Sequence, residues 1–159
     1  MGTEVSTGYA ARVALGPESF DSVFRDGCIE LRSGPQPLSA DAAVSGVLLA
    51  RITRDGGAWT AGDPTNGLRF QRAGRYVAKD PAHRWRLVGV AAGTVGWMRL
   101  LPNPPDPGTT SYTAPRVDGT VGLVDSLGDV QFWLPTLSIS SGTEIEITQF
   151  WYAVPPLGE

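Results

Sequence analysis

Nucleophilic or metal-binding chemistry would have to use a single histidine or a single cysteine, because the 159-residue chain contains one of each. His83 lies in the segment 80–85, a proline-containing turn flanked by arginine, so we interpret it as a structural loop residue. Cys28 opens an expected strand and is interpreted as a small, partly buried side chain. One cysteine allows neither an internal disulfide nor a cysteine-based zinc cluster. We therefore expect no metal and no cofactor.

Paired carboxylates could hydrolyse a glycosidic bond, which requires two of them on opposite sides of a substrate cleft. The possible pairs are Asp125 with Asp129 and Glu144 with Glu146. The first pair lies in a glycine-containing loop, and the second lies on one face of one strand, where charged residues serve solvation. The glycine-rich stretch 89–96 lacks the spacing and the following lysine of a phosphate-binding loop. These patterns predict that the protein is not an enzyme.

Five tryptophans could form a sugar platform if they were stacked on one face of a sheet. Those at positions 85, 97 and 133 lie inside apolar strands, so we expect them to pack in the core. The other two lie in a turn and near the C-terminus, where contacts with another subunit are favoured. Together with nearby aromatic residues, the candidate interface residues are Phe20, Phe24, Trp59, Trp151 and Tyr152.

From residue 28 onward, short apolar runs are separated by glycine- and proline-containing turns, which is typical of a β protein. The chain contains 20 glycines and 13 prolines, which excludes a helix bundle because each interior glycine costs a helix about 1 kcal/mol and each proline about 3. Residues 91–95 and 141–142 are predicted to be hairpin connections, and the five prolines between residues 101 and 116 predict an exposed loop. The expected strands cover residues 28–32, 47–54, 68–70, 75–79, 85–90, 96–101, 116–123, 130–134, 136–140 and 143–150. This spacing predicts an all-β fold, a β-sandwich of jelly-roll type, over residues 28–154, followed by a tail at 155–159.

Residues 1–27 are predicted to form an N-terminal helical arm. Thr7 and Ser19 are the expected caps of two short helices, and the second helix carries an apolar stripe that contains Phe20 and Phe24. Helices this short are not stable alone, so they must pack against the body of this subunit or against a neighbour. We expect an assembly arm, and closure of one end of the same subunit is the alternative.

The charge balance argues against several classes of partner. Thirteen basic and 16 acidic residues give a formal net charge of −3, without a polybasic run, so a nucleic-acid binder is not expected. No apolar stretch approaches 18 residues and no charged-then-apolar leader is present, so we expect neither a membrane span nor a secretory signal.

One stretch of the sequence has a recognisable pattern. It consists of Ile29–Pro37, Ala40–Ala43 and Gly46–Thr53. This stretch resembles a group of small virion proteins of tailed bacteriophages, in which a strand reading like IDIYSGTQP is followed by ADAA and GTLL. Further parts of the pattern are residues 20–26, Gly96–Arg99, Pro115–Gly119 and the terminal Ile-x-Ile-Thr-x-Phe. Val47 stands where threonine is common, and the C-terminal segment 151–156 extends beyond the pattern.

The resemblance implies a structural component of the particle, because small jelly-roll proteins of this kind serve as head decoration or cement. It implies a capsid decoration protein that binds the major capsid protein or other virion proteins on the outside of the head, as a homotrimer. Its location would be the virion, after synthesis in the host bacterial cytoplasm. The alternatives are a structural component of the neck, tail or fibre, and a carbohydrate-binding module that attaches the virion to a host glycan.

Overall fold

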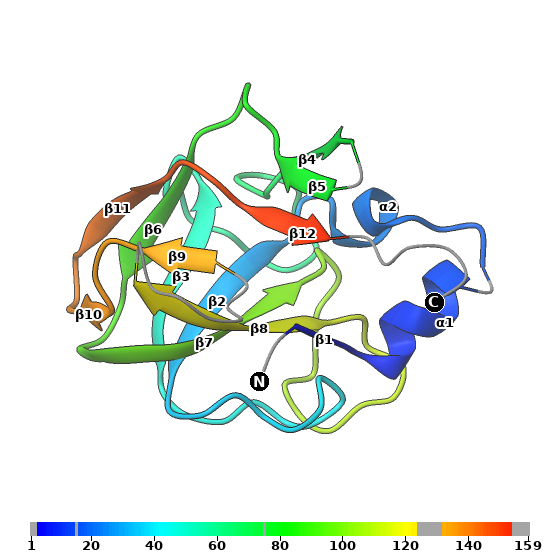
Figure 1. Cartoon of the computed structure of the whole chain (residues 1–159), viewed down its shortest axis with the longest axis horizontal. Coiled ribbons are helices and arrows are strands. Elements are labelled where there is room, and N and C mark those ends of the chain that lie inside the picture. The colour runs from blue at the N-terminus through cyan, green and yellow to red at the C-terminus, as the bar shows by residue number, and fades with distance from the viewer. Residues whose placement is uncertain (1–2, 15, 75, 124–131, 154–159) are drawn as a thin grey trace.

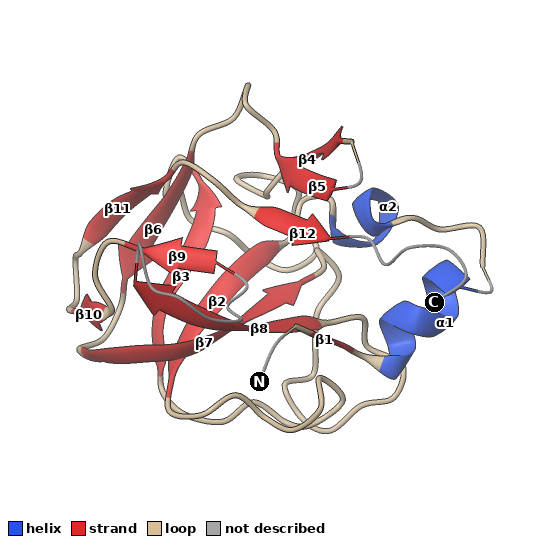
Figure 2. Cartoon of the chain, in the orientation of Figure 1, coloured by secondary structure: helices blue, strands red, loops and turns tan. Residues whose placement is uncertain are grey.

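Strands dominate the computed structural model, which describes residues 3–14, 16–74, 76–123 and 132–153 (Figures 1 and 2). The described helices are α1 (Thr7–Ala14) and α2 (Phe20–Phe24). The described strands are β1 (Glu4–Val5), β2 (Cys28–Ser33), β3 (Leu48–Arg54), β4 (Phe70–Ala73), β5 (Tyr76–Lys79), β6 (Trp85–Gly89), β7 (Gly93–Leu101), β8 (Val117–Leu123), β9 (Phe132–Leu134), β10 (Ser138–Ile139), β11 (Glu144–Ile147) and β12 (Trp151–Ala153). The expectation of a mainly β protein with two short N-terminal helices is confirmed.

The strands form two antiparallel sheets. The larger sheet has the order β1-β8-β7-β2-β3-β6-β11, and β10 adds an eighth antiparallel strand by pairing with β7. β9 lies parallel to β8 at the same sheet. The smaller sheet has the order β12-β5-β4 and lies beside α2 (Figure 2).

Two predicted hairpins are wrong. Residues 91–95 were expected to join a hairpin, but β6 pairs with β3 and β11, whereas β7 pairs with β2 and β8. The Thr143 amide donates to the Ser140 carbonyl at 3.1 Å, so 141–142 is a turn, yet β10 pairs with β7 and β11 with β6. Alternation of apolar residues indicates which side of a strand is buried, and it does not identify the neighbouring strand.

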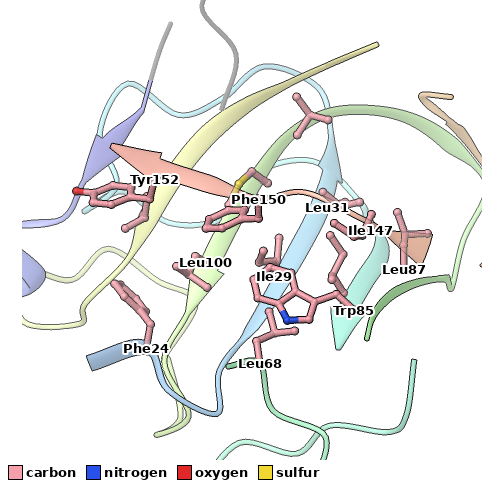
Figure 3. Packing of buried hydrophobic residues seen from close by; sticks show 14 of the residues in the cluster. Phe24, Ile29, Leu31, Leu68, Trp85, Leu87, Leu100, Ile147, Phe150 and Tyr152 are labelled. Carbon is pink, nitrogen blue, oxygen red and sulfur yellow. The ribbon is translucent and has the colours of Figure 1, made fainter. Parts of the chain in front are cut away.

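The hydrophobic core lies on one face of the larger sheet. It combines side chains of that sheet, such as Ile29 and Leu100, with Phe24 of α2 and Tyr152 of the smaller sheet (Figure 3). An aromatic cluster connects these layers. The Phe20 ring stacks on Tyr152 at 4.8 Å between centroids and meets the edge of Phe70 at 5.1 Å. Phe70 in turn lies 5.3 Å from Trp85 of the larger sheet. The fully buried side chains of the core include Phe24, Ile29, Leu31, Ile52, Leu68, Trp85, Leu87 and Leu100.

The described part of the N-terminal segment packs on the body of its own chain. β1 pairs with β8, and Phe20 and Phe24 are 6% and 0% exposed. Ser19 caps α2 in a capping box, as predicted. The cap of α1 is Ser6 instead of the predicted Thr7, because the Ser6 Oγ accepts a hydrogen bond from the Tyr9 amide at 3.2 Å. The packing matches the alternative considered for this segment, and the division of the chain at residues 27 and 154 stays a prediction.

Candidate functional site

Two buried arginine–aspartate pairs occupy the side of the larger sheet opposite the hydrophobic core. Arg99 of β7 donates through Nε and Nη2 to the two carboxylate oxygens of Asp118 on β8, at 2.6 and 2.9 Å, and both side chains are 0% exposed. Arg116 makes the same two-pronged contact with Asp106, at 2.7 and 2.9 Å. Such parallel hydrogen bonds fix the orientation of both partners.

The same two arginines hold together two loops that are far apart in sequence. Arg116 Nη1 donates to the carbonyls of residues 40, 41 and 42, at 3.3, 3.2 and 3.1 Å, and its Nη2 donates to the carbonyl of Thr109 at 2.7 Å. Arg99 Nη2 also donates to the residue 42 carbonyl, at 3.1 Å. The hydrogen bonds of these two arginines therefore link β7, β8 and both loops.

Direct backbone bonds complete the contact between the loops. The Val44 amide donates to the Gly108 carbonyl at 3.0 Å, and the Ser111 amide donates to the Asp41 carbonyl at 2.9 Å. The Asp41 carboxylate accepts from the amide and the hydroxyl of Thr7, at 2.7 and 2.6 Å, which adds the start of α1. We call residues 34–47 and 102–115 together the loop face; its two loops lie side by side along the lower edge of Figure 1.

The loop face presents apolar side chains and very little charge. Leu38 is 86% exposed, Tyr112 67% and Val47 57%, and these are the three most exposed large hydrophobic residues described. Asp41 and Asp106 are the only charged residues in these two segments, in a chain that is 18% charged. Both carboxylates are already engaged, by Thr7 and Arg116.

A row of charges continues across the outer side of the larger sheet. Glu30 of β2 lies between Arg99 and Arg51 in the strand register. Its carboxylate accepts from Arg32 at 3.1 Å and from Arg51 at 3.2 Å. The Arg99 guanidinium also lies over the Trp97 ring, 5.2 Å from its centroid. Cross-strand pairs of opposite charge stabilise neighbouring strands, so this row serves the sheet.

Burial is the main cause of the raised pKa values of Asp118, Cys28 and Tyr9. It raises the pKa of the Asp118 carboxyl, although Arg99 and Arg116 act in the opposite direction. Burial raises the pKa of the Cys28 thiol to about 12 and raises the pKa of Tyr9 well above its usual range. A thiol with so high a pKa is a poor nucleophile at neutral pH.

The residues considered for catalysis do not come together in the described structure. His83 lies in the turn between β5 and β6, whereas Cys28 is fully buried at the start of β2. Glu144 and Glu146 are both exposed on β11, and Glu146 lies 3.5 Å from Arg84. Asp125 and Asp129 lie outside the described residues. No cluster of three or more histidine, cysteine, aspartate or glutamate side chains suited to a metal occurs among the described residues.

The candidate interface residues have different environments. Phe20, Phe24 and Tyr152 are buried in the core of their own chain and offer no surface in this conformation. Trp59 is half-buried, and its Nε1 donates to the Asp26 carbonyl at 2.8 Å. Trp151 is 43% exposed and meets the Tyr76 ring edge-on, at 5.5 Å between centroids.

A sugar platform of several tryptophans is not present among the side chains that the structure describes. Trp85 and Trp97 are both 0% exposed. Trp85 packs in the hydrophobic core as expected, whereas Trp97 lies against the Arg99 guanidinium on the opposite side of the sheet. The Trp133 side chain lies outside the described part. Trp151 and Tyr76 lie at 86° to each other, so they do not form one flat surface.

Neither the buried arginines nor the loop face was predicted from the sequence. Two signals were present. Arg99 interrupts an apolar strand at a position that faces away from the core, and such a residue needs an acidic partner on a neighbouring strand. The two segments of the loop face are also unusually poor in charged residues.

Three segments that carry the resemblance to phage virion proteins meet at the buried pairs. Ala40–Ala43 supplies carbonyls, Gly96–Arg99 supplies one arginine, and Pro115–Gly119 supplies Arg116 and Asp118. The residues described thus define a mainly β protein in which buried arginine–aspartate pairs hold two loops with little charge in one fixed arrangement. No protein-family model, curated protein or solved structure matches the chain. In the described part, no helix is both long and apolar enough to cross a bilayer.

Proposed function

We propose that this chain is a non-enzymatic structural protein of a tailed bacteriophage particle, which binds the major capsid protein or another virion protein on the outside of the head. In this proposal the two sheets form a β-sandwich of jelly-roll type and the protein acts as a homotrimer. Its location is the virion, after synthesis in the bacterial cytoplasm. No cofactor takes part.

The observation that carries the proposal is that the three resembling segments meet at the buried arginine–aspartate pairs, which hold the loop face in place. Their charged side chains are used to hold carbonyls and carboxylates of the same chain, at the distances given above. A protein that acts by binding needs a surface that is already ordered, because ordering it on binding would cost affinity. The arginine pairs supply that order.

The mechanism of stabilisation is mass action. A protein that binds the assembled lattice and has no affinity for the free capsid subunit lowers the free energy of the lattice at every occupied site. At a concentration of about 100 times the dissociation constant, the gain is about 2.7 kcal/mol per site.

The test combines location with binding. Cryo-EM of the intact particle should place the chain on the outer surface of the head. Heads that lack the protein should bind it in a sedimentation assay and should keep it at about 0.5 M salt, where the Debye length is only about 4–5 Å. Density in the neck, tail or fibre would replace the head assignment by that alternative, and release at this salt concentration would contradict apolar binding.

The exposed pair of Tyr76 and Trp151 favours a second candidate, a module that attaches the virion to a host glycan. Both rings are nearly half exposed, at 46% and 43%, and an exposed indole face can stack on a sugar ring. Saturation-transfer NMR with glycans of the host surface would test this. The candidate requires a signal that Trp151→Ala abolishes and that Trp59→Ala leaves unchanged.

A further inference from the structure

We propose that the outer side of the larger sheet holds a small inorganic anion, of the size of chloride, beside the side chains of Arg32, Trp97 and Arg99. The site lies on the side opposite the hydrophobic core, and it does not depend on the proposed function. Three properties carry the inference: buried donors without acceptors, acceptors that are already in use, and an excess of positive charge.

The first property is a set of buried donors. Trp97 Nε1, Arg99 Nη1 and Arg32 Nε are all buried, and none has a hydrogen-bond partner among the described residues. Trp97 and Arg99 are 0% exposed, and the Arg32 side chain is 14% exposed. An indole or guanidinium N–H donates and cannot accept, and a buried donor without an acceptor loses the hydrogen bond that water would give it. These three atoms therefore require an acceptor.

The three side chains are neighbours on one face of the sheet. Trp97 of β7 lies opposite Arg32 of β2 in the strand register, and Arg99 follows two residues later on the same strand. The central carbon of the Arg99 guanidinium is 5.2 Å from the centroid of the Trp97 ring. The face of the ring attracts the guanidinium charge, whereas the indole N–H points outward from the edge of the ring and is not used by this contact. One small ligand at the edge of the ring can therefore contact more than one of these donors.

The second property concerns the acceptors on this side of the sheet. Both carboxylate oxygens of Glu30, Asp106 and Asp118 already accept hydrogen bonds from arginines. In the described part of the chain, every buried side-chain atom without a partner is a nitrogen and none is an oxygen. A water molecule would satisfy a donor but would bring two protons that need acceptors of their own. An anion accepts without donating, so it suits a site with free donors and no free acceptor.

The third property is charge. The buried ion pairs on this side join four arginines to three carboxylates, namely Arg32, Arg51, Arg99 and Arg116 to Glu30, Asp106 and Asp118. These pairs therefore carry one excess positive charge in a chain whose net charge is −3. Glu4 lies beyond Asp118 on the edge strand β1 and forms none of these pairs. One monovalent anion balances the excess. Because Trp97 and Arg99 have no exposed surface, it must be a free ion and not a charged group of a macromolecule.

The experiment compares urea unfolding of the purified chain in sodium chloride and in sodium gluconate at equal ionic strength. Gluconate is too large for a closed site, so it controls for the screening of surface charge. The test variant is Trp97→Phe, which keeps an aromatic ring beside Arg99 and removes the N–H. The matched control is Trp85→Phe, which removes an N–H that is also buried and without a described partner, on the core side of the sheet. The quantity compared is the difference between the two salts for each protein, so a loss of overall stability in a variant does not affect it.

We expect chloride to stabilise the wild-type chain, with a folding equilibrium constant about elevenfold higher at about ten times the dissociation constant. Trp97→Phe should raise the dissociation constant of chloride by at least about tenfold, because a hydrogen bond to a charged group is lost. Trp85→Phe should leave it within about twofold. Equal stability of the wild-type chain in both salts would overturn the inference. A chloride effect of the same size in all three proteins would be a general salt effect, and would overturn it too.

A crystal grown in sodium bromide locates the ion directly. Bromide scatters X-rays anomalously, and we expect an anomalous peak within hydrogen-bond distance of Trp97 Nε1. This measurement uses only the wild-type chain, so it decides the question even if Trp97→Phe does not fold. A water molecule at that position without an anomalous peak would refute the anion site.

Discussion

Removal of the Asp118 carboxylate should be one of the most destabilising single changes in this protein. In the folded chain Asp118 accepts two hydrogen bonds from Arg99, at 2.6 and 2.9 Å, and neither side chain is exposed. In Asp118→Ala the guanidinium would keep one hydrogen bond, to the Ala42 carbonyl. Arg99 Nη1 already has no hydrogen-bond partner among the described residues.

The magnitude follows from leaving a buried charge without its partner. Breaking a buried ion pair from one side costs about 3–5 kcal/mol, whereas a domain of ordinary stability has only about 5–15 kcal/mol in total. With a urea m-value of about 2 kcal/mol/M, the unfolding midpoint should fall by about 1.5–2.5 M. A second variant that removes both charges, Arg99→Met with Asp118→Leu, should lose less than the single variant. This expectation agrees with the raised pKa of Asp118, because burial of the carboxylate outweighs the attraction of the arginines.

The assay is urea unfolding followed by tryptophan fluorescence, with Glu146→Ala as the control. Glu146 and Arg84 are both more than half exposed, so their pair should contribute at most about 1 kcal/mol. If Asp118→Ala costs no more than Glu146→Ala, the buried pair is not a structural anchor. A double variant that is less stable than the single one would refute the reasoning about uncompensated charge.

Three further predictions follow from the core and the helices. Phe24→Ala should lower the free energy of unfolding in urea by about 3–5 kcal/mol, because Phe24 is 0% exposed in its own chain. A loss of self-association at unchanged stability would instead make Phe24 an interface residue. Ser19→Ala removes the cap of α2 and should cost about 1 kcal/mol, whereas Ser45→Ala on an exposed loop should cost little; equal effects would contradict the capping box. The folded pKa values of Cys28 and Tyr9 are raised, so above about pH 9 the unfolded chain releases protons that the folded chain retains. The free energy of unfolding is therefore highest below that pH and falls as the pH rises towards 12, by up to about 1.4 kcal/mol per pH unit for each group. Thermal unfolding midpoints that stay constant from pH 8 to 11 would contradict the burial of both groups.

Local features of the fold were predictable from the sequence because they depend on a few adjacent residues. Ser19 precedes an apolar helical turn, so the cap of α2 could be identified. The alternation of Ile145 and Ile147 with glutamates placed β11 and its buried side, and the structure has Ile147 buried and both glutamates exposed. Trp85 and Trp97 were assigned to buried positions by their apolar neighbours.

Pairing between distant strands was not predictable in the same way. β6 and β7 are adjacent in sequence and separated in the sheet by β2 and β3. Their short connection resembles a hairpin, and only the fit of whole faces distinguishes the two arrangements. The loop face was missed for a related reason, since Arg99, Arg116 and the residue 42 carbonyl come together only after β2, β7 and β8 have paired.

The proline content of residues 101–116 gives a physical reason for the buried arginines. Proline has no amide hydrogen, so a loop with prolines at 102, 104, 105, 107 and 115 has few backbone donors of its own. Buried carbonyls still require donors, and a guanidinium offers five in a fixed plane. Arg116 satisfies the Thr109 carbonyl and three carbonyls of the opposite loop while its charge is balanced by Asp106. Two loops without a regular sheet between them are thereby held as one surface.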